Sequence, residues 1–147
     1  MTLAQGRTVA ACRPLPHIGA PATEVEADRK SLQRIAANLL DNALKYSPAG
    51  STVHVSIGSE DALVSFSVRD EGPGIPPQEL PRVFERFYKG DSSRATAGSG
   101  LGLAIVKHLV RAHAGTVEAA SPPGSGAAFT VRLPRRFAGL RPARRRP

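Results

Sequence analysis

The chain has 147 residues, a hydrophobic content of 41% and a formal net charge of +8. This length suits one domain with a hydrophobic core and is too short for two. The single cysteine, Cys12, excludes an internal disulfide and indicates a reducing, cytoplasmic setting. No apolar run approaches the roughly 20 residues of a membrane-spanning helix.

Most of the positive charge lies at the C-terminal end. Six arginines follow Pro134 with no acid among them, which leaves about +2 on the rest of the chain, so we expect no nucleic-acid partner. The sequence divides into an N-terminal segment at 1–22 with a first strand and a loop, a folded domain at 23–134, and a basic tail at 135–147. The tail has too few apolar residues to order itself and is expected to be solvated.

The first predicted elements are short. Thr8–Cys12 is rich in β-forming residues, and the prolines and glycine between residues 14 and 21 predict a loop. Thr23–Ala27 is expected to form a short strand. Asp28 or Ser31 then offers a side chain that can cap a helix.

A long amphipathic helix follows and ends before Pro48. Asn38, Asn42 and Lys45 share one flank of this helix. Two amide oxygens can coordinate a hard cation and a lysine can bind phosphate, so this flank predicts a site for a metal–nucleotide complex. The apolar residues recur at the spacing that buries the other face: Leu32, Ile35, Ala36, Leu39, Leu40, Ala43 and Leu44.

Two alternating segments, 52–57 and 63–68, predict a β-hairpin with its turn at Gly58–Asp61. The second strand leads directly into Asp70, which is followed by two glycines interleaved with prolines. Such a loop is rigid, and its glycines let the backbone approach a ligand closely.

The second half of the chain contains one more helix and two more strands. The glycines that precede this helix can cradle an anion, although a plain flexible loop has the same composition. Leu103 stands where a dinucleotide fingerprint needs its third glycine, and there is no P-loop motif. The predicted elements are a short helix around Gln78–Leu80, a basic and aromatic segment at Pro81–Gly90, a helix at Leu103–His113 that ends at Gly115, and strands at Thr116–Ala120 and Ala127–Leu133.

Four motifs in this order resemble those of the ATP-binding catalytic domain of bacterial sensor histidine kinases. Asn38–Pro48 resembles the N box, Asp70–Pro76 the first glycine box, Phe84–Tyr88 the F box, and Gly98–Val106 the second glycine box. The resemblance covers Glu24–Pro134. It implies a two-layer α/β sandwich, in which a mixed, mostly antiparallel sheet carries helices on one face.

The resemblance also implies roles for individual residues around Mg²⁺ and ATP. Asp70 would accept a hydrogen bond from the exocyclic amine of adenine, since a carboxylate accepts from an N–H₂ group. Asn38, Arg86 and Lys89 would act on the transferring γ-phosphoryl group. Asn42 would bind Mg²⁺ with Asn38 beside it, and the nucleotide would be held by Asn38, Asn42, Lys45, Tyr46, Asp70, Gly72, Gly74, Gly98, Gly100, Leu101 and Gly102.

Each of these residues has a plainer interpretation when it is taken alone. A helical asparagine is often a surface residue, and an acid after a strand often shapes its own turn, as Asp70 could. Arg86 and Lys89 could be solvated surface cations. Phe84 and Phe87 are expected to be packing residues rather than ligand contacts, and His54, His108 and His113 to be structural.

The position of Asn38 separates the candidate functions. In gyrase-type and chaperone-type ATPases and in anti-sigma serine kinases of the same fold, a glutamate four residues before the metal-binding asparagine acts as base. An amide cannot accept that proton, which favours a histidine kinase. None of the four histidines carries the acid-and-proline sequence that follows a phosphoacceptor histidine.

We therefore expect an enzyme domain that transfers the γ-phosphoryl group of Mg²⁺·ATP to a histidine on a separate dimerisation domain, in the same parent chain or in another protein. A response regulator would be an indirect partner, and the chain alone would be monomeric. The resemblance leaves open whether the parent protein is membrane-anchored. The alternatives are an ATP-dependent interaction module and a serine kinase of the anti-sigma type.

Overall fold

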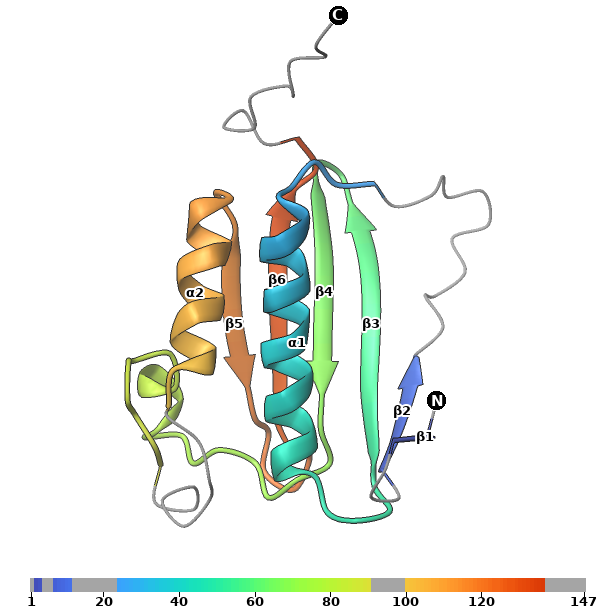
Figure 1. Ribbon diagram of the computed structural model, residues 1–147. Coiled ribbons are helices and arrows are strands. Elements are labelled where there is room, and N and C mark those ends of the chain that lie inside the picture. Colours follow the sequence, from blue (N-terminus) through green and yellow to red (C-terminus); the bar gives the residue numbers. More distant parts are fainter. Residues whose placement is uncertain (1, 4–6, 12–23, 91–99, 137–147) are drawn as a thin grey trace, which may run out of the picture.

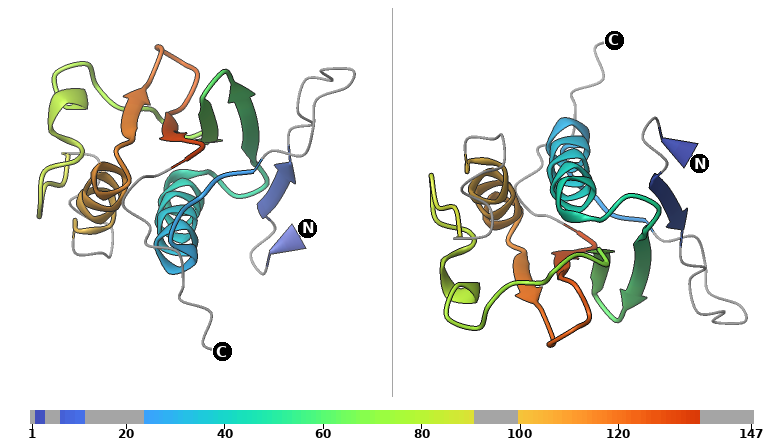
Figure 2. Two further views of the ribbon diagram at one scale, coloured as in Figure 1. Left: turned by 90° about the horizontal axis from the view of Figure 1, so that it is seen from above. Right: turned by 90° about the horizontal axis from the view of Figure 1, so that it is seen from below.

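The computed structural model describes residues 2–3, 7–11, 24–90 and 100–136. They form two layers, a sheet and a pair of helices that cover one of its faces (Figures 1 and 2). This arrangement confirms the expected α/β sandwich. The elements are β1 (Thr2–Leu3), β2 (Arg7–Ala11), α1 (Arg29–Tyr46), β3 (Thr52–Glu60), β4 (Leu63–Arg69), the 3₁₀ helix η1 (Leu80–Arg82), α2 (Gly102–Ala112), β5 (Thr116–Ala120) and β6 (Ala128–Pro134).

The described strands form one mixed sheet in the order β1-β2-β3-β4-β6-β5. β2 and β3 are parallel, and the other neighbouring strands are antiparallel. The register pairs Val55 with Val68, and it pairs Phe66 and Val117 each with Val131. Because side chains alternate along a strand, this register gathers the apolar residues of β3 to β6 on one face.

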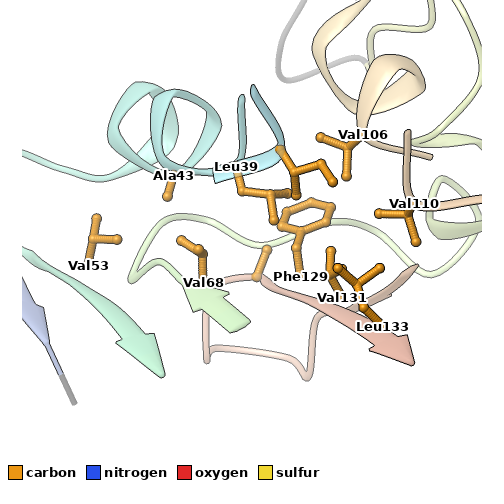
Figure 3. Packing of buried hydrophobic residues seen from close by; sticks show 11 residues of the cluster. Leu39, Ala43, Val53, Val68, Val106, Val110, Phe129, Val131 and Leu133 are labelled. Carbon is orange, nitrogen blue, oxygen red and sulfur yellow. The ribbon is translucent and has the colours of Figure 1, made fainter. Parts of the chain in front are cut away.

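The core lies between this face and the two helices (Figure 3). Leu39 of α1 and Val106 of α2 are fully buried and meet Phe129 of β6 there. Phe84 adds an aromatic contact from the segment before α2, with ring centroids 6.1 Å apart and planes at 88° to the ring of Phe129. None of the helices in the described part of the chain is long and apolar enough to span a membrane.

The cap of α1 also joins the two helices. Asp28 is the N-cap residue, and its carboxylate accepts hydrogen bonds from the backbone N–H and the hydroxyl of Ser31, both at 2.8 Å. The backbone N–H of Asp28 donates to Nε2 of the buried His113 at 3.2 Å. His113 Nδ1 lies 2.8 Å from the carbonyl of Leu109, which can only accept. These contacts fix the His113 ring between the start of α1 and the end of α2, in the structural role expected for it.

Two sequence predictions are wrong in this part of the chain. Residues 24–27 form no strand, because their backbone pairs with the end of the sheet through one bond, from Glu26 N–H to the carbonyl of Arg135 at 2.8 Å. The hairpin turn is shorter than Gly58–Asp61, because β3 continues to Glu60 opposite Leu63. Asp61 takes the left-handed conformation there with a φ of 47°, which an aspartate tolerates better than most residues.

The short helix around Gln78–Leu80 is also displaced. Residues 77–79 form a turn, and the helical residues are those of η1.

Gly115 follows α2 as predicted, but for a different reason. Ala114, not Gly115, has the left-handed φ of 56° that ends the helix. A Cβ atom on Gly115 would lie 2.5 Å from the carbonyl oxygen of Arg132, so the glycine is needed for close packing against β6.

These two neighbours give a paired prediction for stability. Ala114→Gly should raise the free energy of unfolding by about 0.5 kcal/mol, since relief of the left-handed strain exceeds the extra freedom of glycine in the unfolded chain. Gly115→Ala should lower it by about 2 kcal/mol through overpacking. Urea denaturation measures both. A tolerated Gly115→Ala together with a destabilising Ala114→Gly would show that the two roles have been assigned in the wrong order.

Candidate functional site

A pocket opens at the end of the sheet where β4 and β5 end, beside the C-terminus of α1 and the N-terminus of α2 (Figure 1). Its walls come from four separate parts of the chain, and most of the lining is apolar or backbone. The lining residues are Asn42 and Tyr46 of α1; Asp70, Pro73, Gly74 and Ile75 after β4; Glu79, Val83, Tyr88 and Gly90; and Leu103, Ala127 and Phe129.

Asp70 is the buried acid of this pocket, with 2% of its surface exposed. Its Oδ1 atom accepts hydrogen bonds from the backbone N–H of Gly72 at 2.8 Å and of Ala127 at 3.2 Å. Burial raises the pKa of Asp70 above its ordinary value, and the two backbone bonds oppose this shift. No described residue donates to Oδ2. One carboxylate oxygen is thus fixed by the protein, and the other is left for a ligand.

Three glycines permit the close packing around Asp70. A Cβ atom on Gly72 would lie 2.5 Å from the carbonyl oxygen of Tyr46, and one on Gly126 would lie 2.0 Å from that of Asp70. Gly74 has a φ of 80° and approaches Ser121 Oγ closely. A side chain at any of the three positions would push the loop after β4 away from its neighbours.

Glu71, the acid next to Asp70, is directed to the opposite side of the loop. Its carboxylate lies 3.0 Å from His54 Nε2 and accepts from the backbone N–H of Thr52 at 3.2 Å. The hydrogen bond with His54 is the main cause that lowers the pKa of Glu71, followed by the bond from Thr52. Glu71 therefore fastens the loop to the start of β3, while Asp70 faces the pocket.

The polar flank of α1 reaches the same site only in part. Asn42 and Tyr46 line the pocket, and Lys45 Nζ lies 5.4 Å from the centre of the Tyr46 ring. Asn38 is not among the lining residues, but its Oδ1 would lie 3.8 Å from a Cβ at Gly102, where α2 begins. Its Nδ2 is buried and has no hydrogen-bond partner among the described residues. A buried amide without a partner is costly, and it fits a polar ligand group that would complete the site.

Arg86 and Lys89 lie outside this pocket. They line a separate, open depression on the segment before residue 91, together with Arg82, Glu85, Phe87 and Tyr88. Phe87 is 71% exposed, so its predicted packing role is wrong, whereas Phe84 packs as expected. Phe87 also has a φ of 62°, a strained value for a bulky residue.

The glycine triplet before α2 is described only in part. Gly98 lies outside the described residues. Gly100 has a φ of 71°, and its carbonyl accepts from the backbone N–H of Phe87 at 3.0 Å. Leu101 is the N-cap residue of α2 without a side-chain cap bond, and Gly102 is the first helical residue.

The turn between β5 and β6 belongs to the site, and sequence reasoning missed it. The backbone N–H of Ala127 donates to the Asp70 carboxylate, and Gly126 has no side chain that would collide with the Asp70 backbone. Ser121 accepts a hydrogen bond from the loop after β4. The sequence predicts Ala127 only as the start of the last strand and indicates no role in the site for Ser121 or Gly126. The glycine that ends the turn, directly before a strand, was the available signal for a close backbone approach.

Comparisons with known proteins agree on one family. Residues 27–136 match the model of histidine kinase-, DNA gyrase B- and HSP90-like ATPases. The chain is 50% identical over 112 residues to the sensor-like histidine kinase SenX3 of Mycobacterium tuberculosis, covering 75% of this chain and 27% of that protein. It is 43% identical over 114 residues to the sensor histidine kinase WalK of Bacillus subtilis, covering 75% and 19%. The chain thus spans about a quarter or less of the length of these relatives.

Solved structures give the same result. The mycobacterial sensor histidine kinase MprB has a TM-score of 0.72 and 37% identity, covering 89% of this chain and 84% of that chain. Full-length ShkA in complex with AMPPNP has a TM-score of 0.74 and 33% identity, covering 93% and 28%. The chain belongs to the family of histidine kinase-, DNA gyrase B- and HSP90-like ATPases, as an ATP-binding catalytic domain of the sensor histidine kinase type.

Proposed function

We propose that this domain binds Mg²⁺·ATP with adenine against Asp70 and donates the γ-phosphoryl group to a histidine on a separate dimerisation domain. The observation that carries the proposal is the buried carboxylate of Asp70, a pocket-lining residue whose Oδ1 accepts from two backbone amides while no described residue donates to Oδ2. An acceptor in an apolar pocket suits the amine of adenine and opposes the carbonyl oxygen at the same position of guanine.

The phosphate side of the proposed site lies between α1 and the start of α2. Asn42 and Asn38 are the residues that would hold Mg²⁺ through their amide oxygens. The unpartnered Nδ2 of Asn38 is a donor and would suit a phosphate oxygen beside the metal. Mg²⁺ held there neutralises charge on the phosphates. Lys45 would add a positive charge from the same flank, and the positive end of the α2 dipole favours an anion. Arg86 and Lys89, on the outer surface, would reach the γ-phosphoryl group only from outside the pocket.

The acceptor must come from another domain. Position 38 holds an amide, which cannot take the proton that a glutamate accepts at this position in the related ATPases. The exposed Phe87, beside Arg86, offers an apolar contact for such a partner. The relatives are named as sensor histidine kinases, which supports a helical, histidine-bearing domain as the partner. A response regulator would follow it, and the cytoplasm would be the compartment.

Asp70→Asn tests adenine recognition. The asparagine Oδ1 would keep the bonds from Gly72 and Ala127, which would direct its N–H₂ group at the amine of adenine. We expect ATP affinity to fall about 10- to 100-fold and the preference for ATP over GTP to shrink, because two donors then face each other. Calorimetric titration with both nucleotides measures this. Asp61→Asn, at the far end of β4, is the matched control, and an unchanged ATP-to-GTP ratio in Asp70→Asn would contradict the assignment.

The two neighbouring acids should show opposite effects of charge removal on stability. The folded-state pKa of Asp70 is raised, so its ionised form destabilises the nucleotide-free fold at neutral pH, and this cost disappears as pH falls below its ordinary value of 3.8. Glu71 has a lowered pKa, so its ionised form stabilises the fold above its ordinary value of 4.5, and this is lost as pH falls.

Urea unfolding between pH 3 and pH 7.5 should therefore give differences of opposite sign. At pH 7.5 Asp70→Asn should be more stable than the unmodified chain and Glu71→Gln less stable, and both differences should shrink towards acid pH. Two differences of the same sign at pH 7.5 would show that burial of the ionised Asp70 carboxylate does not destabilise the nucleotide-free fold.

Phosphoryl transfer is tested with γ-labelled ATP, Mg²⁺, this chain and a separately prepared dimerisation domain from the parent protein. We expect label on a histidine of that domain, stable to base and labile to acid, and much less with Asp70→Asn at an ATP concentration that does not saturate this variant. Nucleotide binding without transfer would instead support an ATP-dependent interaction module, and acid-stable label on serine would support an anti-sigma-type kinase.

The same assay tests the partner contact at Phe87. Phe87→Asn keeps a residue that tolerates the positive φ and removes the apolar surface. Transfer should slow about tenfold or more, as for an interface anchor, with ATP affinity unchanged. Leu63→Ser removes a comparable exposed apolar side chain, 42% exposed, at the opposite end of the sheet. Equal slowing by both variants would rule out a specific contact at Phe87.

A further inference from the structure

The loop after β4 (residues 70–75) and the β5–β6 turn (residues 121–127) are joined at two points. At the first, Asp70 and Ala127 exchange hydrogen bonds: the Asp70 N–H donates to the Ala127 carbonyl at 2.9 Å, and the Ala127 N–H donates to Asp70 Oδ1 at 3.2 Å. At the second, the hydroxyl of Ser121 lies between Ile75 and Gly126. Ser121 itself is not a lining residue of the pocket.

Ser121 Oγ uses its donor and an acceptor position at once. It accepts from the backbone N–H of Ile75 at 2.7 Å and donates to the carbonyl of Gly126 at 2.6 Å. Both bonds are partly shielded from water, so water replaces them poorly. Ile75 lines the pocket, and the first bond therefore fixes the far end of the loop that begins at Asp70.

The second bond acts on Asp70 through one peptide group. The carbonyl of Gly126 and the N–H of Ala127 belong to the same planar peptide unit and point in opposite directions. When Ser121 holds the carbonyl, it also directs the Ala127 N–H at Asp70 Oδ1. Gly126 has a φ of 70° and no Cβ to restrict it, so its own backbone does little to fix that plane.

We propose that Ser121 is a positioning residue for nucleobase recognition, which orients the carboxylate of Asp70 through the Gly126–Ala127 peptide group. This inference rests on the proposed adenine-binding function. With the hydroxyl in place, Oδ1 is held and Oδ2 faces the base at a fixed angle. Without it, the peptide plane and the carboxylate rotate, and the contact with the exocyclic amine loses its geometry before the rest of the pocket is affected.

The test measures how tightly each protein variant binds each of two nucleotides, by calorimetric titration of the full chain with Mg²⁺. The two nucleotides are ATP and purine riboside 5′-triphosphate, which lacks the exocyclic amine. We expect Ser121→Ala to weaken ATP binding about tenfold and to weaken binding of the amine-free analogue much less. Ser121→Thr, which keeps a hydroxyl, should restore the discrimination. Ser125→Ala, in the same turn with an exposed side chain, is the matched control.

The outcomes separate this inference from the proposed function. If the unmodified chain binds the two nucleotides equally or binds neither, adenine recognition by Asp70 is wrong and the inference falls with it. If the unmodified chain discriminates and Ser121→Ala discriminates by the same factor, only the role of Ser121 is overturned, even where the variant melts at a lower temperature. Should Ser121→Ala not fold, Ser121→Cys gives the same test, because a thiol of similar size is a weak hydrogen-bonding group.

Discussion

The site depends on a single carboxylate that has been removed from water. An isolated buried charge is unfavourable, and Asp70 is accommodated because backbone amides reach it from two sides. One amide comes from its own loop. The other comes from Ala127, which the antiparallel register of β4 and β6 places opposite Asp70, directly after the pair Arg69 and Ala128. The register that builds the core therefore also builds the recognition group, and any shift of β6 would disturb both.

Much of the fold follows from local patterns in the sequence. The spacing of apolar residues predicted α1 and α2 close to their observed bounds, and alternation predicted β3 and β4. The errors arose where tertiary contacts outweigh local composition. Gly58 suggested a turn, but cross-strand pairing with Ser65 extends β3 through it. Gly115 does follow the end of α2 as predicted, but a glycine is required there by the nearby backbone of Arg132, a contact that no local pattern contains.

The site could be predicted to the extent that each motif carries its own chemistry. Asp70 and Asn42 were identified as single residues and are found in one pocket. Ser121 and Ala127 could not be found this way, because their contribution is a hydrogen bond across more than 40 residues of sequence. Phe87 was misjudged for a related reason. An aromatic residue in an amphipathic segment usually packs inward, yet here the bond from Phe87 N–H to Gly100 and the positive φ turn the ring outward.

The arrangement also explains why recognition and transfer can be separated in such a domain. The groups proposed to select the base are fixed by short hydrogen bonds to the ends of strands, and these bonds form within the described part of the chain. The groups proposed for the phosphates are less complete: Asn38 Nδ2 is buried without a hydrogen-bond partner among the described residues, and Arg86 lies outside the pocket. A rigid base site lets the domain bind nucleotide by itself. A phosphate site that is completed only by ligand and acceptor makes the chemical step depend on docking, and with an amide at position 38 in place of a base, water gains little help in replacing the acceptor.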